Sequence, residues 1–260
     1  MDAPFVALDL GNRRFKAGWF KGTGTLERAL SLTYDQVGSQ WGPWLALGPA
    51  VGHAVSSVVC DPARATGIMA LVEAELGLRV EVNPAPGLQM AVRSPETVGL
   101  DRLYAARAAL ARGLEAAVVV DVGTAMTVDV VTRATTDGAS AGTFLGGAIA
   151  PGPELVAEAL AGPEQLYGVS PRPDAPALGR DTRAALEAGV AHTVAGAALR
   201  LADGVRSESG LELATLVLTG GARGFVAQAL AAAGWEIVEA PHLVLEGLAA
   251  CARSVGQAST

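Results

Sequence analysis

The chain has 260 residues, half of them apolar and 17% charged, and its 19 basic and 26 acidic residues give a net charge of −7. It lacks the basic stripe of a general nucleic-acid-binding protein, and no apolar run reaches the roughly 18 residues of a membrane-spanning helix. Composition therefore argues against nucleic-acid and membrane partners. It leaves a small anionic ligand open, because a few local cations suffice for one.

The cysteines and the N-terminus bear on the compartment. Cys60 and Cys251 are far apart and in no metal-ligand spacing, so we expect reduced thiols. The opening MDAPFVALDL carries an acid where a secretory signal would carry positive charge. We therefore expect a cytoplasmic protein.

In the first half of the chain, apolar periodicity predicts a hairpin followed by mixed strands and helices. The expected elements are, in chain order, strands at 3–10, 14–20 and 52–60, a helix at 61–77, a Pro- and Gly-rich loop at 83–99 and a helix at 101–113. Asp61 is a candidate N-cap with Pro62 at the first helical position, and Gly113 is a candidate helix end.

The pattern of the opening hairpin returns after residue 116. VALDLGNRRFKA aligns with VVVDVGTAMTVD, so Asp9 falls on Asp121 and Gly11 on Gly123. The second half is then expected to contain a helix at 181–206, a strand at 212–221, a helix near 223–234, a short strand and a last helix from about 242. We therefore predict a duplicated α/β chain, with an N-terminal half at 1–114 and a C-terminal half at 115–260 facing each other across a cleft.

Four Gly-containing turns each follow an apolar strand: Asp9–Asn12, Asp121–Thr124, Gly146-Gly147 and Thr219–Gly221. Glycine lets backbone N–H groups approach an anion, whereas a neighbouring carboxylate repels phosphate unless a cation lies between them. The pattern therefore indicates a divalent metal, bound largely through water as magnesium prefers, with Lys16 placed to meet a terminal phosphate. The alternative is four tight turns that need Gly for a positive φ.

A loop meets a helix at Gly99-Leu100-Asp101-Arg102. Asp101 is either a helix N-cap or a general base that accepts a proton from a substrate hydroxyl. Arg102 would hold the anionic end of the substrate or the charge of the transferred phosphoryl group. Chemistry alone leaves both interpretations of Asp101 open.

The paired Asp-x-Gly hairpins resemble those of the actin-like superfamily of acetate and sugar kinases and chaperone ATPases, which have duplicated ribonuclease H-like domains. With the Gly-x-Asp-Arg pattern added, the chain resembles a type III pantothenate kinase along nearly its whole length. The matching stretches are Asp9–Lys16, Pro95–Arg102, Asp121–Asp129, FLGGAIAPG, LGRDTRAALEAGV, LTGGA and LVLEGLAA.

The resemblance implies ATP-dependent phosphorylation of pantothenate, the first step towards coenzyme A, with Asp101 as the base. It implies a pantothenate site formed by Gly99, Leu100, Asp101, Arg102 and Thr182. It implies an ATP site formed by Asp9, Leu10, Gly11, Asn12, Arg13, Arg14, Phe15, Lys16 and Thr124. Asp9 would bind Mg²⁺ through water, and Asp121 would bind a monovalent cation, K⁺ or NH₄⁺. Family members are homodimers, so Thr182 would act from the partner chain.

Two positions depart from the family pattern. Arg13 stands where Ser or Thr is usual, and Val92 stands where Tyr usually walls the pantothenate pocket. They motivate two alternatives: a non-catalytic relative that binds nucleotide or pantothenate as a regulator, and a kinase of another small alcohol. Retention of Asp9, Asp101 and Asp121 argues against the regulator, because a binding module needs no base.

Overall fold

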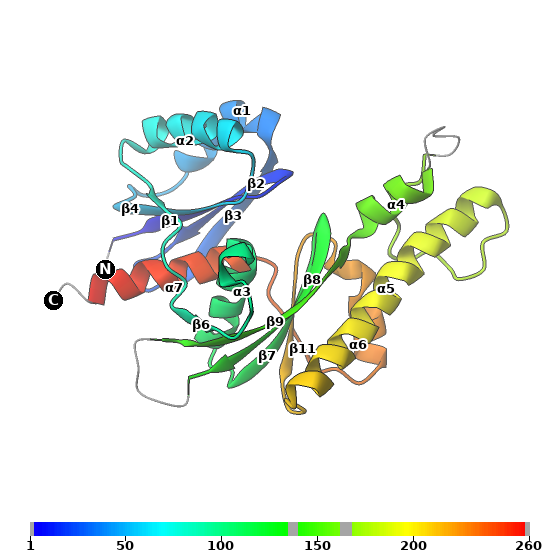
Figure 1. Cartoon of the computed structure of the whole chain (residues 1–260). Helices are drawn as coiled ribbons and strands as arrows, with labels where there is room; N and C mark the ends of the chain where they lie inside the picture. The colour runs from blue at the N-terminus through cyan, green and yellow to red at the C-terminus, as the bar shows by residue number, and fades with distance from the viewer. Residues whose placement is uncertain (1–2, 135–139, 162–167, 258–260) are drawn as a thin grey trace.

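The computed structural model describes residues 3–134, 140–161 and 168–257, which form two β-sheets and seven α-helices (Figure 1). The first sheet contains β1 (Phe5–Leu10), β2 (Arg14–Phe20), β3 (Leu26–Thr33), β4 (His53–Val58) and β5 (Glu81–Val82). The second contains β6 (Leu88–Met90), β7 (Ala116–Val122), β8 (Ala125–Arg133), β9 (Gly142–Pro151), β10 (Thr215–Thr219) and β11 (Ile237–Glu239).

The two sheets repeat one topology. The first has the order β3-β2-β1-β4-β5, and the second has the order β11-β10-β7-β8-β9-β6. Without its edge strand β6, the second sheet reads β9-β8-β7-β10-β11, which matches the first strand for strand. In each sheet an antiparallel hairpin, β1–β2 or β7–β8, is followed by a parallel neighbour, β4 or β10. The predicted fold class, duplicated ribonuclease H-like domains of the actin-like ATPase type, is confirmed.

Helices cover both faces of each sheet. Their bounds are α1 (Tyr34–Leu45), α2 (Pro62–Leu76), α3 (Leu100–Ala111), α4 (Pro153–Ala161), α5 (Thr182–Ser209), α6 (Ala227–Ala232) and α7 (Leu243–Gln257). Helices α1 and α2 share a core with the outer face of the first sheet, and α4, α5 and α6 share one with the outer face of the second. Helices α3 and α7 lie between the sheets (Figure 1).

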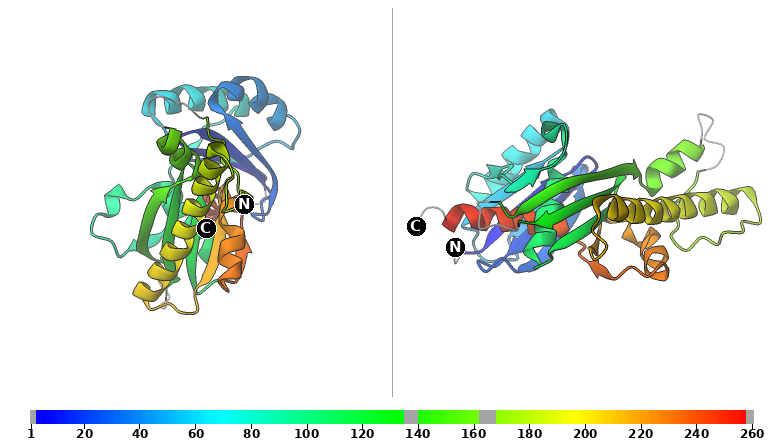
Figure 2. Two further views of the ribbon diagram at one scale, coloured as in Figure 1. Left: turned by 90° about the vertical axis from the view of Figure 1, so that its right-hand side faces the viewer. Right: turned by 60° about the horizontal axis from the view of Figure 1, so that its bottom comes forward.

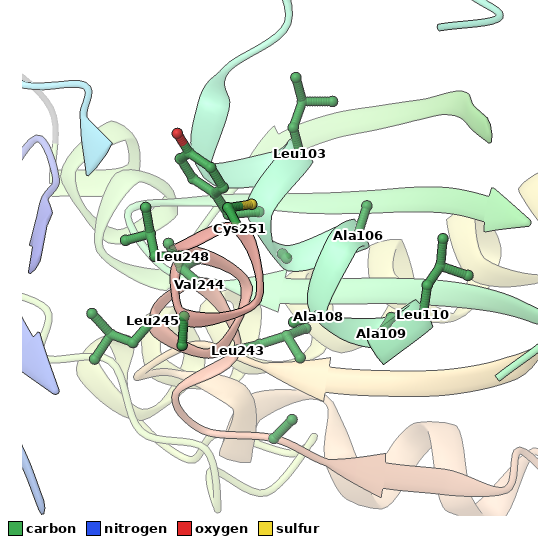
Figure 3. Packing of buried hydrophobic residues seen from close by; sticks show 14 of the residues in the cluster. Leu103, Ala106, Ala108, Ala109, Leu110, Leu243, Val244, Leu245, Leu248 and Cys251 are labelled. Atoms are coloured by element: carbon green, nitrogen blue, oxygen red, sulfur yellow. The ribbon is translucent and has the colours of Figure 1, made fainter. Parts of the chain in front are cut away.

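The central helix pair packs closely because its contact residues are small. Ala106, Ala108 and Ala109 of α3 lie in one buried cluster with Val244 and Leu248 of α7, as Figure 3 shows. A Cβ on Gly247 of α7 would collide with the backbone of Tyr104 in α3. This position explains the glycine of the LVLEGLAA stretch, since any side chain would force the helices apart.

Each half reaches into the other. Strand β6 precedes residue 114 but pairs with β9 of the second sheet, and α7, at the C-terminal end, packs on β1, β2 and β4 of the first. The boundary between residues 114 and 115 stays a prediction. Strand β6 and helix α7 each pack on the sheet of the other half. Within the described ranges, every helix is too short or too polar to cross a membrane.

Several elements differ from the sequence-based expectation. The helix expected from 101 begins at Leu100, with Gly99 as its N-cap, so Asp101 is its second residue and not an N-cap. The helix expected near 223–234 is a single 3₁₀ turn followed by α6. The expected loop at 83–99 contains β6, whose three residues are too few to show a strand pattern.

Candidate active site between the two hairpins

The alternation of strand residues places two carboxylates on facing sides of the sheets. In β1, Val6, Leu8 and Leu10 enter the outer core, whereas Phe5 and Ala7 face the central helices; Asp9 shares their side. In β7, Ala117 and Val119 face the same helices, so Asp121 does too. Both acids therefore emerge at the carboxyl ends of their strands beside the layer where α3 begins.

Lys16 neutralises the first of these acids. It lies opposite Asp9 in the β1–β2 hairpin, and its Nζ donates to Asp9 Oδ2 at 3.1 Å. Asp9 raises the pKa of Lys16 more than burial lowers it, and Asp121 and Asp101 raise it further. Asp9 is 2% exposed, and its Oδ1 has no hydrogen-bond partner within the described residues.

Asp101 comes to the same place from the start of α3. Its Oδ1 accepts from the backbone N–H of Arg102 at 2.9 Å. Burial raises the pKa of Asp101, and the nearby charge of Asp9 adds to the rise; Lys16 and Arg102 oppose it. Because its pKa is raised, this carboxylate in the first turn of α3 is suited to accept a proton near neutral pH.

Asp121 is the most perturbed carboxyl of the group. Burial is the main cause that raises its pKa to about 6; Asp101 and Asp9 add to the rise and Lys16 counters it. A Cβ on Gly220, where φ is +93°, would lie 2.5 Å from Asp121 Oδ1. The glycine turn after β10 therefore passes so close to this carboxylate that a side chain at position 220 would collide with it.

Arg102 is held by a residue to which sequence analysis gave no role. Its Nε lies 3.1 Å from both oxygens of Asp129 in β8, and its Nη2 bonds Oδ1 as well. Asp129 is 1% exposed, and the guanidinium lies 5.5 Å from the ring centre of Phe144. Asp129 is the last residue of the stretch Asp121–Asp129, which resembles the family. The one sequence signal for the contact is its pairing with Val119 in the hairpin, which places Asp129 on the face of the sheet towards α3.

The other residues predicted to bind ATP in the first hairpin point either into the outer core or towards the surface. Leu10 and Phe15 are fully buried in the outer core, so only their backbones are available to a ligand. Arg14 donates to Ser31 of β3. Arg13 forms an ion pair with Glu158 of α4 at 3.0 Å, which links the hairpin to the other half.

The turn residues Gly11 and Asn12 lie at the tip of the first hairpin, and Thr124 at the tip of the second, where its carbonyl accepts from Gly152 N at 3.0 Å. Leu100 packs partly buried against the central core beside Gly99. Thr182 does not join this group: it is the exposed first residue of α5, whose beginning projects beyond the sheets with α4 (Figure 2). The predicted site residues other than Thr182 thus gather near the two hairpins.

Two surface cavities of about 240 Å³ each lie elsewhere. One is lined by α3, α7 and Gly24 of the β2–β3 turn, and the other by Trp19, Arg28 and Leu47. Neither is lined by the cluster of Asp9, Lys16, Asp101 and Asp121. The case for the cluster as the active site is therefore its concentration of buried charge, which is typical of functional sites.

Duplicated sheets with a carboxylate at the end of each first strand define an actin-like kinase or ATPase. Solved structures agree on the fold: the chain matches component A of (R)-2-hydroxyglutaryl-CoA dehydratase from Acidaminococcus fermentans, with a TM-score of 0.52, 13% identity, and coverage of 99% of this chain and 100% of that one. It also matches a protein from Campylobacter jejuni described as a Baf family transcriptional activator, with a TM-score of 0.52, 18% identity, and coverage of 97% and 99%.

The family model for type III pantothenate kinase matches residues 5–203, and the chain belongs to that family. A type III pantothenate kinase from Thermomicrobium roseum is 34% identical over 83% of this chain and 85% of its own length, and one from Anaeromyxobacter dehalogenans is 31% identical over 94% and 96%. One from Rhodopirellula baltica is 43% identical over 60% of this chain and 55% of its own length.

The chain is thus an enzyme, a kinase that uses ATP, and the comparisons favour pantothenate phosphorylation over a non-catalytic binding role.

Proposed function

We propose that this chain transfers the terminal phosphoryl group of ATP to the hydroxyl of pantothenate, giving 4′-phosphopantothenate, with Asp101 as the general base. The main support for the proposal is the convergence of Asp101 with Lys16, Asp9 and Asp121, because the charge of Asp9 raises the pKa of Asp101, Asp121 and Lys16. Phosphoryl transfer needs such a cluster, because catalysis is mainly positioning and charge neutralisation.

Asp101 removes the hydroxyl proton as the oxygen attacks phosphorus. Burial and the charge of Asp9 raise the pKa of this carboxyl, so the proton transfer is better matched than it would be for a solvated aspartate. Lys16 lies among the three acids and neutralises charge on the phosphoryl group in transfer. Arg102 is locked by Asp129 and presents its remaining N–H groups to pantothenate, beside Gly99 and Leu100.

The carboxylates fit the two cations that the family implies. Asp9 keeps one buried oxygen without a protein partner, which suits a hydrated Mg²⁺, and a divalent ion there would neutralise phosphate charge when bound. Asp121 has no ion-pair partner within the described residues, and burial raises its pKa to about 6. A K⁺ or NH₄⁺ ion would favour its charged form. Thr124, at the tip of the same hairpin, would contact ATP.

We further propose a homodimer in the cytoplasm, in which Thr182 of one subunit completes the pantothenate site of the other. Thr182 is the exposed first residue of α5, whose beginning projects beyond the sheets with α4 (Figure 2). Large apolar side chains are exposed on or beside that region: Ile149 at 64%, Leu160 at 45% and Leu178 at 70%. A covered dimer face would remove them from water.

Mass-spectrometric detection of 4′-phosphopantothenate tests the reaction. The purified chain with ATP, Mg²⁺, K⁺ and pantothenate should form the product, and ADP release should require pantothenate. A panel of other small alcohols serves as the specificity control, since Val92 leaves the pocket wall changed. ADP release with another alcohol and none with pantothenate would overturn the substrate assignment.

A further inference from the structure

Three successive carbonyl groups at the tip of the β1–β2 hairpin each accept a hydrogen bond from outside the hairpin. The Leu10 oxygen accepts from the N–H groups of Val59 and Cys60, both at 3.1 Å. The Gly11 oxygen accepts from the Tyr34 hydroxyl at 2.5 Å, and the Asn12 oxygen accepts from Arg64 Nη1 at 3.2 Å. The Tyr34 and Arg64 donors come from α1 and α2 on the outer side of the first sheet, whereas Val59 and Cys60 directly follow β4, the strand beside β1.

Tyr34 and Arg64 form one unit. Tyr34 is the first residue of α1, Arg64 is in the first turn of α2, and the guanidinium lies 4.9 Å from the centre of the Tyr34 ring. Burial, reinforced by a hydrogen bond with Cys60, raises the pKa of the Tyr34 phenol, so it stays protonated and able to donate. Neither residue belongs to a stretch that resembles the family motifs.

Holding a carbonyl also fixes the next amide. In a trans peptide the C=O of one residue and the N–H of the next lie in one plane and point in opposite directions, and the described residues contain no cis peptide. Tyr34, by binding the Gly11 oxygen, turns the Asn12 N–H away from the outer helices. Arg64, by binding the Asn12 oxygen, does the same to the Arg13 N–H. Both amides are thereby directed away from the Tyr34 hydroxyl and the Arg64 guanidinium.

These two amides are available to a ligand. The Gly11 N–H is already used by the Arg14 oxygen at 3.1 Å, whereas the N–H groups of Asn12 and Arg13 find no protein acceptor in the part of the chain that the structure describes. Successive free amides in a turn form an anion-binding concavity. Lys16, two residues beyond Arg14, supplies the positive charge beside it.

We propose that Tyr34 and Arg64 are positioning residues that hold the Asn12 and Arg13 amides ready for the β- and γ-phosphates of the nucleotide. The inference rests on the proposed ATP site of this hairpin. It assigns a role in nucleotide affinity to two side chains that touch neither nucleotide nor pantothenate. It also predicts that their effect is confined to phosphate-bearing ligands.

Tyr34→Phe is the direct test, because it removes the hydroxyl and keeps the ring under Arg64. We expect KM for ATP and Kd for ADP to rise about 3- to 10-fold, the usual effect of one lost hydrogen bond. The kcat, KM for pantothenate and Kd for adenosine should stay unchanged. Hydrogen exchange in a peptide covering 9–16 should become faster.

Tyr104→Phe is the matched control. The Tyr104 hydroxyl also donates to a backbone carbonyl, that of Pro84 at 2.8 Å, but away from the hairpin. This variant should lower Tm without changing KM for ATP or exchange in 9–16. Arg64→Met should weaken ADP binding in the same direction as Tyr34→Phe, and the two changes should be non-additive because the side chains act as one unit.

The outcomes separate the two claims. If the wild-type chain forms no phosphopantothenate, the proposed function fails, while ADP binding and hydrogen exchange still test the positioning role. If the wild type is active but Tyr34→Phe binds ATP and ADP as tightly as before, the positioning role is wrong. An equal loss of adenosine affinity, or a loss of Tm matching that of Tyr104→Phe with no change in exchange at 9–16, would also overturn it.

Discussion

The β1–β2 and β7–β8 hairpins occupy equivalent places in the two sheets, but they treat their carboxylates differently. In the first, Lys16 lies directly across from Asp9. In the second, the connection is one residue shorter, and Thr127 lies across from Asp121. The first acid therefore has a cation within its own hairpin, while burial raises the pKa of the second to about 6. The two hairpins share one scaffold, and the cross-strand residue decides whether the carboxylate has a cation within its own hairpin.

Asp129 provides a third case, since its cation comes from another element. Arg102 of α3 supplies two donors to this buried carboxylate and thereby fixes the start of the helix that carries Asp101. The three carboxylates thus differ in their ion-pair partner. Asp9 has a lysine of its own hairpin, Asp129 has an arginine of the central helix α3, and Asp121 has no ion-pair partner within the described residues.

The largest effect on stability should follow from breaking the Arg102–Asp129 pair. Arg102→Met leaves a nearly fully buried carboxylate unpaired, so we expect a loss of about 3–5 kcal/mol in the free energy of unfolding. The double variant Arg102→Met/Asp129→Leu should regain most of it, because both charges are gone, yet remain impaired in pantothenate KM. Chemical denaturation measures the first effect, and a double variant no more stable than the single one would contradict the interpretation.

A smaller effect concerns pH and Asp121. Its folded-state pKa of about 6 is above the ordinary 3.8, so the folded chain holds this proton more tightly than the unfolded chain. Its contribution to stability is therefore present below about pH 4 and is lost as the pH rises to about 6, by up to ~3 kcal/mol. Asp101 and Asp129 act in the same direction.

Asp121→Asn should remove its own part of that loss. In a buffer free of K⁺ and NH₄⁺, we expect the variant to be more stable than the wild type at pH 7.5 and about equal to it at pH 4. Adding K⁺ should narrow the difference at pH 7.5 by stabilising only the wild type. Thermal unfolding measures this, and a wild type that gains stability between pH 4 and pH 7.5 relative to the variant would refute the assignment.

The smallest effect tests the comparison by making the second hairpin like the first. Thr127→Lys places a cation opposite Asp121, as Lys16 stands opposite Asp9. If Asp121 binds a monovalent ion, omitting K⁺ should lower kcat/KM of the wild type by about tenfold, equivalent to ~1.4 kcal/mol, and should affect Thr127→Lys little. Thr127→Met, which adds similar bulk without charge, should keep the dependence. Equal K⁺ dependence in all three proteins would argue against a cation at Asp121.

The repeat of Asp9 in Asp121 could be predicted from sequence because both acids end valine- or leucine-rich strands before an Asp-x-Gly turn. Lys16 was expected to meet a terminal phosphate, which stays a prediction, and its contact with Asp9 across the hairpin was not predicted. The fold class followed from the same duplication. These inferences needed only strand periodicity and the order of elements.

Other contacts could not be found in this way. The Arg102–Asp129 pair joins a helix to a strand 27 positions along, and the Tyr34 and Arg64 bonds reach the hairpin from two separate helices. No local pattern encodes such contacts, because they depend on how α1, α2 and α3 pack. The pairing of β6 with β9 could not be predicted either, because a three-residue strand carries too little pattern. Nor could the ion pair between the exposed guanidinium of Arg13 and Glu158 of α4.

The proposed role of Asp101, as acceptor of the pantothenate proton where the two hairpins converge, can be tested directly. The direct test is a single-turnover measurement of 4′-phosphopantothenate formation by the wild type and Asp101→Asn, with saturating ATP, Mg²⁺ and K⁺. We expect a rate roughly 10²- to 10⁴-fold lower in the variant, with near-native Tm and unchanged Kd for ADP. A variant that forms product at the wild-type rate would contradict it.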